Sequence, residues 1–223
     1  MSGMMHLGLY LDAPLQSWGY QSRFDRRTSL SYPTRSGIVG MLCAAMGVDR
    51  SDSHGLVQFS DLKMIVYVFS GHGRLMDFHT VGGGWDKKTD PQNIVPKADG
   101  SAGDTVVTRR EFLQHAKFGV VLQGDIALLD RIAAALQNPR WGIWLGRKAC
   151  IPASPLFQGV HDSEALALQR LQERADTGCG ARSIIREVDR FEDGTDTLMD
   201  TPLDFAKREF IPRRVSVEPP GGE

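Results

Sequence analysis

The sequence has little of what marks a secreted, membrane-bound or metal-binding protein. Its 223 residues include only 3 cysteines, Cys43, Cys150 and Cys179, which are widely spaced and form no CxxC pair. Neither a disulfide framework nor a zinc site is therefore predicted. No apolar run approaches the roughly 18 residues that a membrane span needs, and the apolar stretch 4–11 is too short and interrupted for a signal peptide. We expect a cytoplasmic protein of one domain, or at most two small ones.

Motifs of metal-dependent and nucleotide-dependent enzymes are also missing. The 6 histidines form no HxH or HExxH pattern, and there is no GxSxG elbow, GxGxxG loop or GxxxxGK[ST] loop. The glycine run 82–84 precedes charged residues instead of an apolar helix, so it is typical of a hinge and not of a phosphate-binding loop. The sequence therefore predicts no metal site and no cofactor.

Net charge is nearly absent, at −1, which by itself argues against a polyanionic partner. The average hides an asymmetry, because residues 1–160 carry 17 Lys/Arg against 13 Asp/Glu, whereas residues 161–223 carry 9 against 14. The first part thus has a net charge of +4 and the second a net charge of −5. This distribution fits a basic working surface followed by an acidic segment, although chance drift in a neutral globule would give the same numbers.

Hydrophobic periodicity predicts alternating strands and helices over the first part of the chain. The predicted segments are, in order, a strand at 6–12, a helix at 38–46 capped by Thr34 or Ser36 and closed by Gly47, a strand at 62–69, strands at 105–113 and 118–122, and a helix at 126–136. Further on, the pattern indicates short apolar runs at 141–148 and 151–157, an exposed helix at 163–174 and short strands near 183–188 and 210–217.

Between His79 and Asp104 the composition changes to glycine, proline and charged residues, with almost no material for a core. A segment of this length without secondary structure inside a domain is usually a functional protrusion or arm. The order of the elements around it is that of the βαββαβ ferredoxin-like plan, which also underlies RRM domains. We therefore predict an α+β fold, with a body at 1–160, an insertion at about 79–112 and an acidic C-terminal extension at 161–223 packed on the body.

The best catalytic candidate is His115 with Lys117, close behind Arg109 and Arg110. Metal-free RNA cleavage needs a base for the 2′-hydroxyl and a cation for the developing phosphorane charge, so this group would suit a ribonuclease. The alternative is that His115 and Lys117 are solvated residues in the turn before the strand at 118–122.

Basic and aromatic residues alternate in the loop between the first strand and the first helix. The basic ones are Arg23, Arg26, Arg27 and Arg35, and the aromatic ones are Trp18, Tyr20, Phe24 and Tyr32. Single-stranded RNA binding uses guanidinium groups for phosphates and ring faces for splayed bases. A solvated arginine-rich loop with its aromatic rings in the core is the alternative. Two further basic pairs, Arg109–Arg110 and Arg147–Lys148, and backbone N–H groups at Ser36 and Gly37 favour the RNA interpretation modestly.

Several motifs follow one another in a recognisable order. They are PLQSWG at 14–19, YPTRSGIVG at 32–40 with MLCAAMG behind it, FHTV at 78–81, REFL at 110–113, and WLGRK at 144–148 with PLFQG at 155–159. Together they strongly resemble the CasD subunits of type I-E CRISPR Cascade, the fifth Cas protein family within the RAMP superfamily. The resemblance covers about 7–159 and fades in the acidic C-terminal quarter, where only 205–209 still resembles the family. No C-terminal glycine-rich RAMP loop is present.

The resemblance implies a ferredoxin-like RAMP body with a long β-hairpin thumb at the position of the insertion. It implies a non-catalytic subunit that binds the 5′ handle of the CRISPR RNA, contacts the CasC backbone subunit and the large subunit CasA, and meets target DNA only through the complex. His115 and Lys117 would then do no chemistry. The RNA-contact candidates from the residues and the resemblance together are Gln16, Trp18, Arg23, Arg26, Arg27, Tyr32, Pro33, Thr34, Arg35, Ser36, Gly37, His79, Arg109, Arg110, Arg147 and Lys148.

Overall fold

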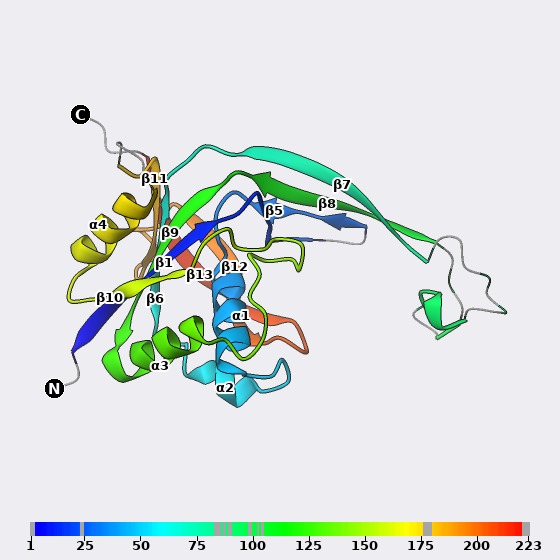
Figure 1. Ribbon diagram of the computed structural model, residues 1–223, viewed down its shortest axis with the longest axis horizontal. Helices are drawn as coiled ribbons and strands as arrows, with labels where there is room; N and C mark the ends of the chain where they lie inside the picture. The colour runs from blue at the N-terminus through cyan, green and yellow to red at the C-terminus, as the bar shows by residue number, and fades with distance from the viewer. Residues whose placement is uncertain are drawn as a thin grey trace.

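Strands dominate the computed structural model, which describes residues 3–22, 25–82, 86, 88, 91–97, 100–101, 103, 105–175 and 180–219 (Figure 1). Its strands are β1 (Met4–Asp12), β2 (Leu15–Gln16), β3 (Trp18–Gly19), β4 (Arg26–Arg27), β5 (Ser29–Leu30), β6 (Lys63–Val68), β7 (Gly73–Val81), β8 (Val106–Gln114), β9 (Lys117–Asp125), β10 (Phe157–His161), β11 (Ser183–Val188), β12 (Asp196–Asp204) and β13 (Glu209–Glu218). Its helices are α1 (Arg35–Met46), α2 (Ser53–Val57), α3 (Ile126–Gln137), α4 (Glu164–Ala175) and a 3-10 turn, η1 (Pro91–Asn93). No helix within the described ranges is long and apolar enough to cross a membrane.

The largest sheet has seven strands in the order β10-β1-β9-β6-β11-β13-β12, and every neighbouring pair is antiparallel. Along the chain, α1 lies between β1 and β6, and α3 lies between β9 and β10. The predicted strands at 6–12, 62–69 and 118–122 and the predicted helices at 38–46 and 126–136 are confirmed. The fold is therefore α+β, and the strands after residue 182 extend the same sheet that the first strand begins.

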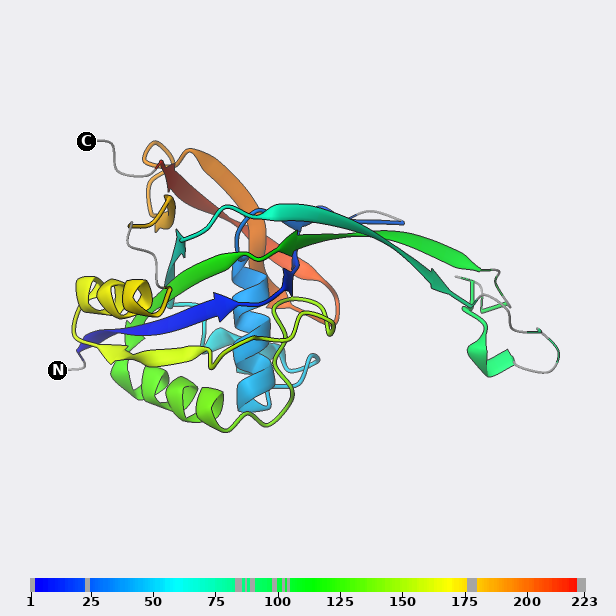
Figure 2. The same cartoon turned by 45° about the horizontal axis from the view of Figure 1, so that its top comes forward.

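Helices cover both faces of this sheet. Alternate residues of the strands, such as Leu9 and Val66, point into the main core beneath α1 and α3. The residues between them, such as Tyr10 and Tyr67, point into a second core that α4 closes (Figure 2). Leu171 of α4 is fully buried there. The helix predicted at 163–174 is thus present, but the prediction that it is exposed is wrong, because its apolar stripe packs on the sheet.

A long β-hairpin projects from the body (Figures 1 and 2). It consists of β7 and β8, which pair antiparallel from Gly73 opposite Gln114 to Val81 opposite Val106. Near its base, β8 also pairs with the short strands β2 and β4. The strand predicted at 105–113 is confirmed. Hydrophobic periodicity does not predict β7, whose last residues extend past His79 into the segment that composition alone predicts to lack secondary structure.

Candidate nucleic-acid interface

Four segments that are distant in sequence meet at a hollow of about 250 Å³ near the N-terminus of α1. They are the loop around β3, the first turn of α1, the loop before β10 and the turn between β12 and β13. The lining residues are Ser17, Trp18, Gly19, Thr34, Ser36, Gly37, Gly146, Arg147, Phe205 and Phe210. We call this site the α1 hollow. It brings together three of the sequence motifs: PLQSWG, YPTRSG and WLGRK.

Gln16 and Trp18 hold the first of these loops from inside the protein. Both are fully buried. The Gln16 side-chain amide donates to the carbonyl oxygen of Ala116 at 2.7 Å, and its oxygen accepts from the Trp18 indole at 3.2 Å. The Trp18 amide donates to Ser29 Oγ at 2.8 Å. In this structure the two predicted RNA-contact side chains therefore support the hollow from inside the protein, and of the two only Trp18 is among the residues that line it.

Two glycines let the loops approach one another. Gly146 has a φ of +98°, where side chains are strained, and a Cβ there would overlap the carbonyl oxygen of Ser17. A Cβ on Gly37 would lie 2.8 Å from Cε3 of Trp18. Because both positions are in van der Waals contact with neighbouring segments, the glycines of the YPTRSG and WLGRK motifs are explained by packing around the hollow.

The N-terminus of α1 is capped by Thr34, as the sequence predicts. Thr34 is buried, and its hydroxyl oxygen accepts from the Gly37 amide at 3.2 Å. The Arg35 amide donates to Asp200 Oδ2 at 2.7 Å. For the Ser36 amide no hydrogen-bond partner is found among the described residues, and Ser36 lines the α1 hollow. A backbone donor at the positive end of the helix dipole is thus available to an anion there.

The Arg35 side chain, by contrast, points into the protein. It is 5% exposed, and its guanidinium donates to Glu187 at 2.8 Å and to the carbonyl oxygens of Phe59 and Ser60 at 3.0 Å each. Glu187 also pairs with Arg213, which in turn pairs with Asp200. We expected Arg35 to face RNA, but its donors are committed to a buried ion network. The physical reason is that acidic partners from β11 and β12 compensate its charge.

Pro33 and Tyr32 lie beside this network. Pro33 is buried, and Tyr32 is partly buried. Burial and the negative charge of Asp196 raise the pKa of the Tyr32 hydroxyl to about 12, so this phenol stays neutral at physiological pH. The structure therefore places Tyr32 and Pro33 in the support of α1, next to the hollow but not among the residues that line it.

Four arginines are aligned across two strands at the base of the hairpin. β4 runs parallel to β8, with Arg26 opposite Arg109 and Arg27 opposite Arg110. Because partners in a ladder point to the same face and successive residues point to opposite faces, each face of the sheet carries one arginine pair. The sequence shows the two Arg-Arg dipeptides, but their alignment side by side depends on the register between β4 and β8, which only the fold provides.

The pair of Arg27 and Arg110 belongs to the face that carries Arg147. The Arg147 guanidinium donates to the carbonyl oxygens of Glu111 and Arg27 at 2.8 Å each and lies 4.6 Å from the Phe112 ring centroid. Burial lowers the pKa of Arg147, and the positive charges of Arg110 and Arg27 lower it further. Three arginines therefore cluster on this face, with the carboxylate of Asp77 opposite Arg110 on β7, and a phosphate group would balance their excess positive charge.

Arg26 and Arg109, the pair on the opposite face, have other contacts than Arg27 and Arg110. Arg109 forms an ion pair with Asp25 at 2.7 Å and lies 5.8 Å from the Phe78 ring centroid, while Arg26 is exposed. His79 is exposed on β7, opposite Thr108. The Lys148 ammonium lies 5.8 Å from the Trp144 ring centroid, next to Arg147 in the chain. Arg23, also predicted to contact RNA, lies outside the described residues.

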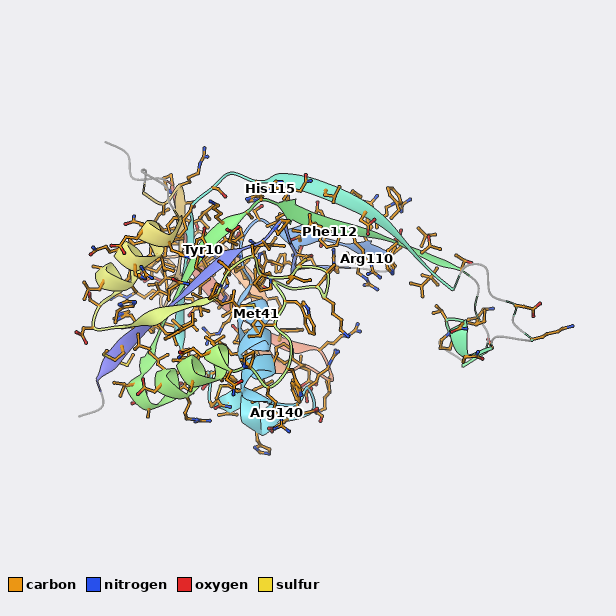
Figure 3. All side chains as sticks on the ribbon, in the orientation of Figure 1. Tyr10, Met41, Arg110, Phe112, His115 and Arg140 are labelled. Atoms are coloured by element: carbon orange, nitrogen blue, oxygen red, sulfur yellow. The ribbon has the colours of Figure 1, made fainter. Side chains whose placement is uncertain are left out.

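His115 lies in the turn between β8 and β9, away from Arg110 (Figure 3), and Lys117 is the first residue of β9. His115 has a φ of +54° and is exposed. Its backbone amide donates to the carbonyl oxygen of Pro14 at 3.1 Å, and the Lys117 amide donates to Ser70 Oγ at 3.0 Å. The contacts found for this turn thus hold its backbone. In the described part of the chain no three His, Cys, Asp or Glu side chains gather in a way that could hold a metal ion.

Phe205 and Phe210 line the α1 hollow but were not among the predicted site residues. They flank the turn between β12 and β13, and their rings meet edge to face at 6.4 Å. The only signal for them in the sequence is the resemblance of residues 205–209, in a quarter of the chain where it otherwise fades. The C-terminal strands therefore contribute a wall to a site whose other walls come from residues 17–37 and 146–147.

Comparisons with known proteins show the family of this chain. Residues 7–216 match a family model described as CRISPR-associated protein (Cas_Cas5). The CRISPR system Cascade subunit CasD of Escherichia coli (strain K12) is 28% identical over 220 residues, which are 92% of this chain and 94% of that protein.

Two solved structures are similar over almost the whole chain. One, described as a CRISPR RNA-guided surveillance complex, contains a chain of 34% identity with a TM-score of 0.79, covering 96% of this chain and 90% of that one. The other, described as the crystal structure of a Cas protein, has 30% identity and a TM-score of 0.66, covering 96% and 94%. Because the family model spans nearly all of the sequence, this chain belongs to the CRISPR-associated Cas5 family.

Proposed function

We propose that this chain is a non-catalytic subunit of a Cascade-type CRISPR surveillance complex and that it binds the 5′ handle of the CRISPR RNA. The observation that carries the proposal is the α1 hollow, where three sequence motifs converge beside Arg27, Arg110 and Arg147. Arginines for phosphates, a free helix-terminal amide and aromatic walls suit single-stranded RNA. The related Cascade subunit and surveillance-complex chain support the same role.

The strand order supports a specific architecture for this role. The segment β10-β1-β9-β6, with α1 and α3 as its crossover helices, has the strand order expected of a ferredoxin-like domain. We propose that it is the RAMP body within 1–160, that residues 161–223 are an extension packed on it, and that the β7–β8 hairpin is the thumb. The thumb would lie over the guide beside a CasC subunit, the body would contact CasA, and target DNA would be reached only through the complex.

The first prediction tests the arginines at the hollow. Changing Arg27 and Arg110 together to Ala should weaken binding of a labelled handle RNA, because two charge-assisted phosphate contacts are lost. We expect the slope of log K against log salt to become shallower by about 0.7 for each phosphate contact removed from a single strand. The measurement is a salt titration of RNA affinity by the purified chain, alone and with its partner subunits.

Changing Arg170 and Arg190 together to Ala is the matched control, because it removes the same two positive charges from exposed positions outside the hollow. It should leave both affinity and slope unchanged. A double variant at Arg27 and Arg110 whose slope equals that of the unaltered protein would contradict RNA binding at this site.

The ribonuclease alternative is tested with a labelled repeat RNA in EDTA. A non-catalytic subunit leaves a labelled repeat RNA intact over hours. Site-specific cleavage that disappears in His115→Ala would show that the chain processes precursor RNA, with His115 as acid or base.

A further inference from the structure

A second hollow adjoins the α1 hollow on the same side of helix α1. Its volume is about 390 Å³, and its lining residues are Gly40, Cys43, Ala44, Val48, Arg50, Trp141 and Phe205. Phe205 borders both hollows. Helix α1 contributes Ser36, Gly37, Gly40, Cys43 and Ala44 to the two hollows. Residues three or four positions apart lie on the same side of a helix, so these five share one face. The two hollows therefore form one groove along α1, with Phe205 at their junction.

Small side chains keep the floor of this groove open. A Cβ on Gly40 would lie 3.8 Å from Cζ of Phe205, so the ring passes close above the helix backbone. Ala44 continues the floor one turn further on. Aromatic rings stand over a floor that is little more than backbone, which leaves room for a flat group between them.

Hydrogen bonds hold the backbone of both aromatic wall residues, Trp141 and Phe205. The Trp141 amide donates to the carbonyl oxygen of Ala44 at 3.1 Å, and the Arg140 amide donates to that of Ala45 at 2.9 Å. Figure 3 shows Arg140 at the C-terminal end of α1 accordingly. On the other side, Arg50 Nε donates to the carbonyl oxygen of Phe205 at 3.0 Å. The indole of Trp141 is nevertheless 43% exposed, so its position is fixed while a large part of its surface stays accessible.

Charge distinguishes the groove from an apolar docking surface. Among the described residues, the two linings contain Arg50 and Arg147 and no Asp or Glu. The nearest acidic side chain in the Phe205 turn, Asp204, is buried and accepts from the Lys207 amide at 2.8 Å. Burial and the carboxylate of Asp52, which lies outside the lining, raise the pKa of the Cys43 thiol. The lining itself carries only positive charge beside its aromatic walls, which fits a polyanion with flat bases better than an apolar protein segment.

We propose that the space between Trp141 and Phe205 binds a nucleobase of the same single-stranded RNA, next to the nucleotides in the α1 hollow, with Arg50 on the side of the phosphate. The assignment rests on the proposed function, since it extends the RNA path from the hollow along α1. It gives Trp141 and Arg50 roles in RNA binding that the sequence motifs do not indicate, and it gives Phe205 a second contact beside the one in the α1 hollow.

The test replaces single bases of the handle RNA by 2-aminopurine, one position at a time. In complex with the unaltered protein, one position should show strong fluorescence quenching that depends on Trp141. Trp141→Ala should abolish this quenching and weaken binding by about 5-fold to 150-fold, the range for losing one stacked base. Trp141→Phe should keep both the signal and most of the affinity, because a ring face remains.

Phe191→Ala is the control. Phe191 lies in the loop before β12 and is 73% exposed. Its ring centroid is 4.1 Å from Cζ of Arg214, and it belongs to neither lining. It should leave quenching unchanged. Melting curves of the Trp141 variants check that they fold.

The outcomes separate the two proposals. Failure of the unaltered protein and its complex to bind the handle overturns the proposed function. Handle binding with a 2-aminopurine pattern that Trp141→Ala does not change overturns the groove assignment alone. If the Trp141→Ala variant binds RNA with normal affinity but no longer assembles into the complex, the groove holds a protein segment. This outcome also overturns the assignment.

Discussion

At the scale of single residues, the site depends on side chains that are absent as much as on those present. Gly146 joins Leu145, whose carbonyl oxygen accepts from the Ser17 amide at 3.0 Å, to Arg147, which reaches the hairpin. Its left-handed φ and its contact with Ser17 leave no space for a side chain. The position of Arg147 therefore follows from a glycine that itself touches no ligand.

Gly146→Ala should consequently impair both stability and RNA binding. We expect a loss of roughly 1–3 kcal/mol in the free energy of unfolding from the strained φ, and weaker RNA binding because the loop that carries Arg147 must move. Gly19→Ala is the control, since Gly19 lines the same hollow but a Cβ added to it would meet no other atom within 4 Å. Urea unfolding and RNA titration of the two variants make the comparison, and equal behaviour would contradict the role given to Gly146.

At the scale of elements, α4 is attached to the sheet by a polar cluster at its first turn. Glu164 accepts from the Tyr67 hydroxyl at 2.5 Å and forms a two-bond pair with Arg186 at 2.7 and 2.8 Å. These donors, led by Arg186, hold the pKa of Glu164 below its usual value. The carboxylate thus joins α4 to β6 and β11, on the face opposite the α1 hollow.

The pH dependence follows from the direction of this shift. A carboxyl group whose pKa is lower in the folded than in the unfolded state stabilises the fold above its unfolded pKa, and this contribution is lost as the pH falls through the folded pKa. Glu164→Gln should therefore cost about 1–2 kcal/mol at pH 7 and much less near pH 3. Unfolding midpoints of both proteins across this range measure the difference. A difference in stability between the two proteins that grows as the pH falls would contradict the role given to the Glu164 carboxylate.

The sequence predicts elements well where their signal is local. The apolar stripe of α3 and the cap of α1 lie within a few residues, so both helices are found. β7 is exposed along its whole length and buries neither face, so its order comes from pairing with β8 about 30 residues later. Burial of Arg35 depends on Glu187 and Asp200, more than 150 positions away. No local pattern reveals such partners, and the only signal for Phe205 in the sequence is the family resemblance of residues 205–209.

At the scale of the whole molecule, the C-terminal quarter is integrated with the rest. β11 pairs with β6, so the sheet continues from the basic part of the chain into the acidic part. Part of the acidic excess has a specific use, because Glu187 and Asp200 neutralise Arg35 and Arg213 in the buried network. The opposite charges of the two parts thus meet inside the protein, and the network connects the start of α1 to three C-terminal strands.

Asp200→Ala should therefore destabilise the whole molecule and not only its C-terminal strands. It removes the acceptor of the Arg35 amide and leaves Arg213, whose side chain is 9% exposed, without its closest partner. Breaking a buried pair in this way costs about 3–5 kcal/mol. Asp189→Ala is the control, because its ion pair with Lys63 is exposed, and exposed pairs contribute about 1 kcal/mol or less. Calorimetry should show one transition in both variants, at a much lower temperature for Asp200→Ala. A separate early transition confined to β12 and β13, with the rest of the fold unaffected, would contradict the coupling.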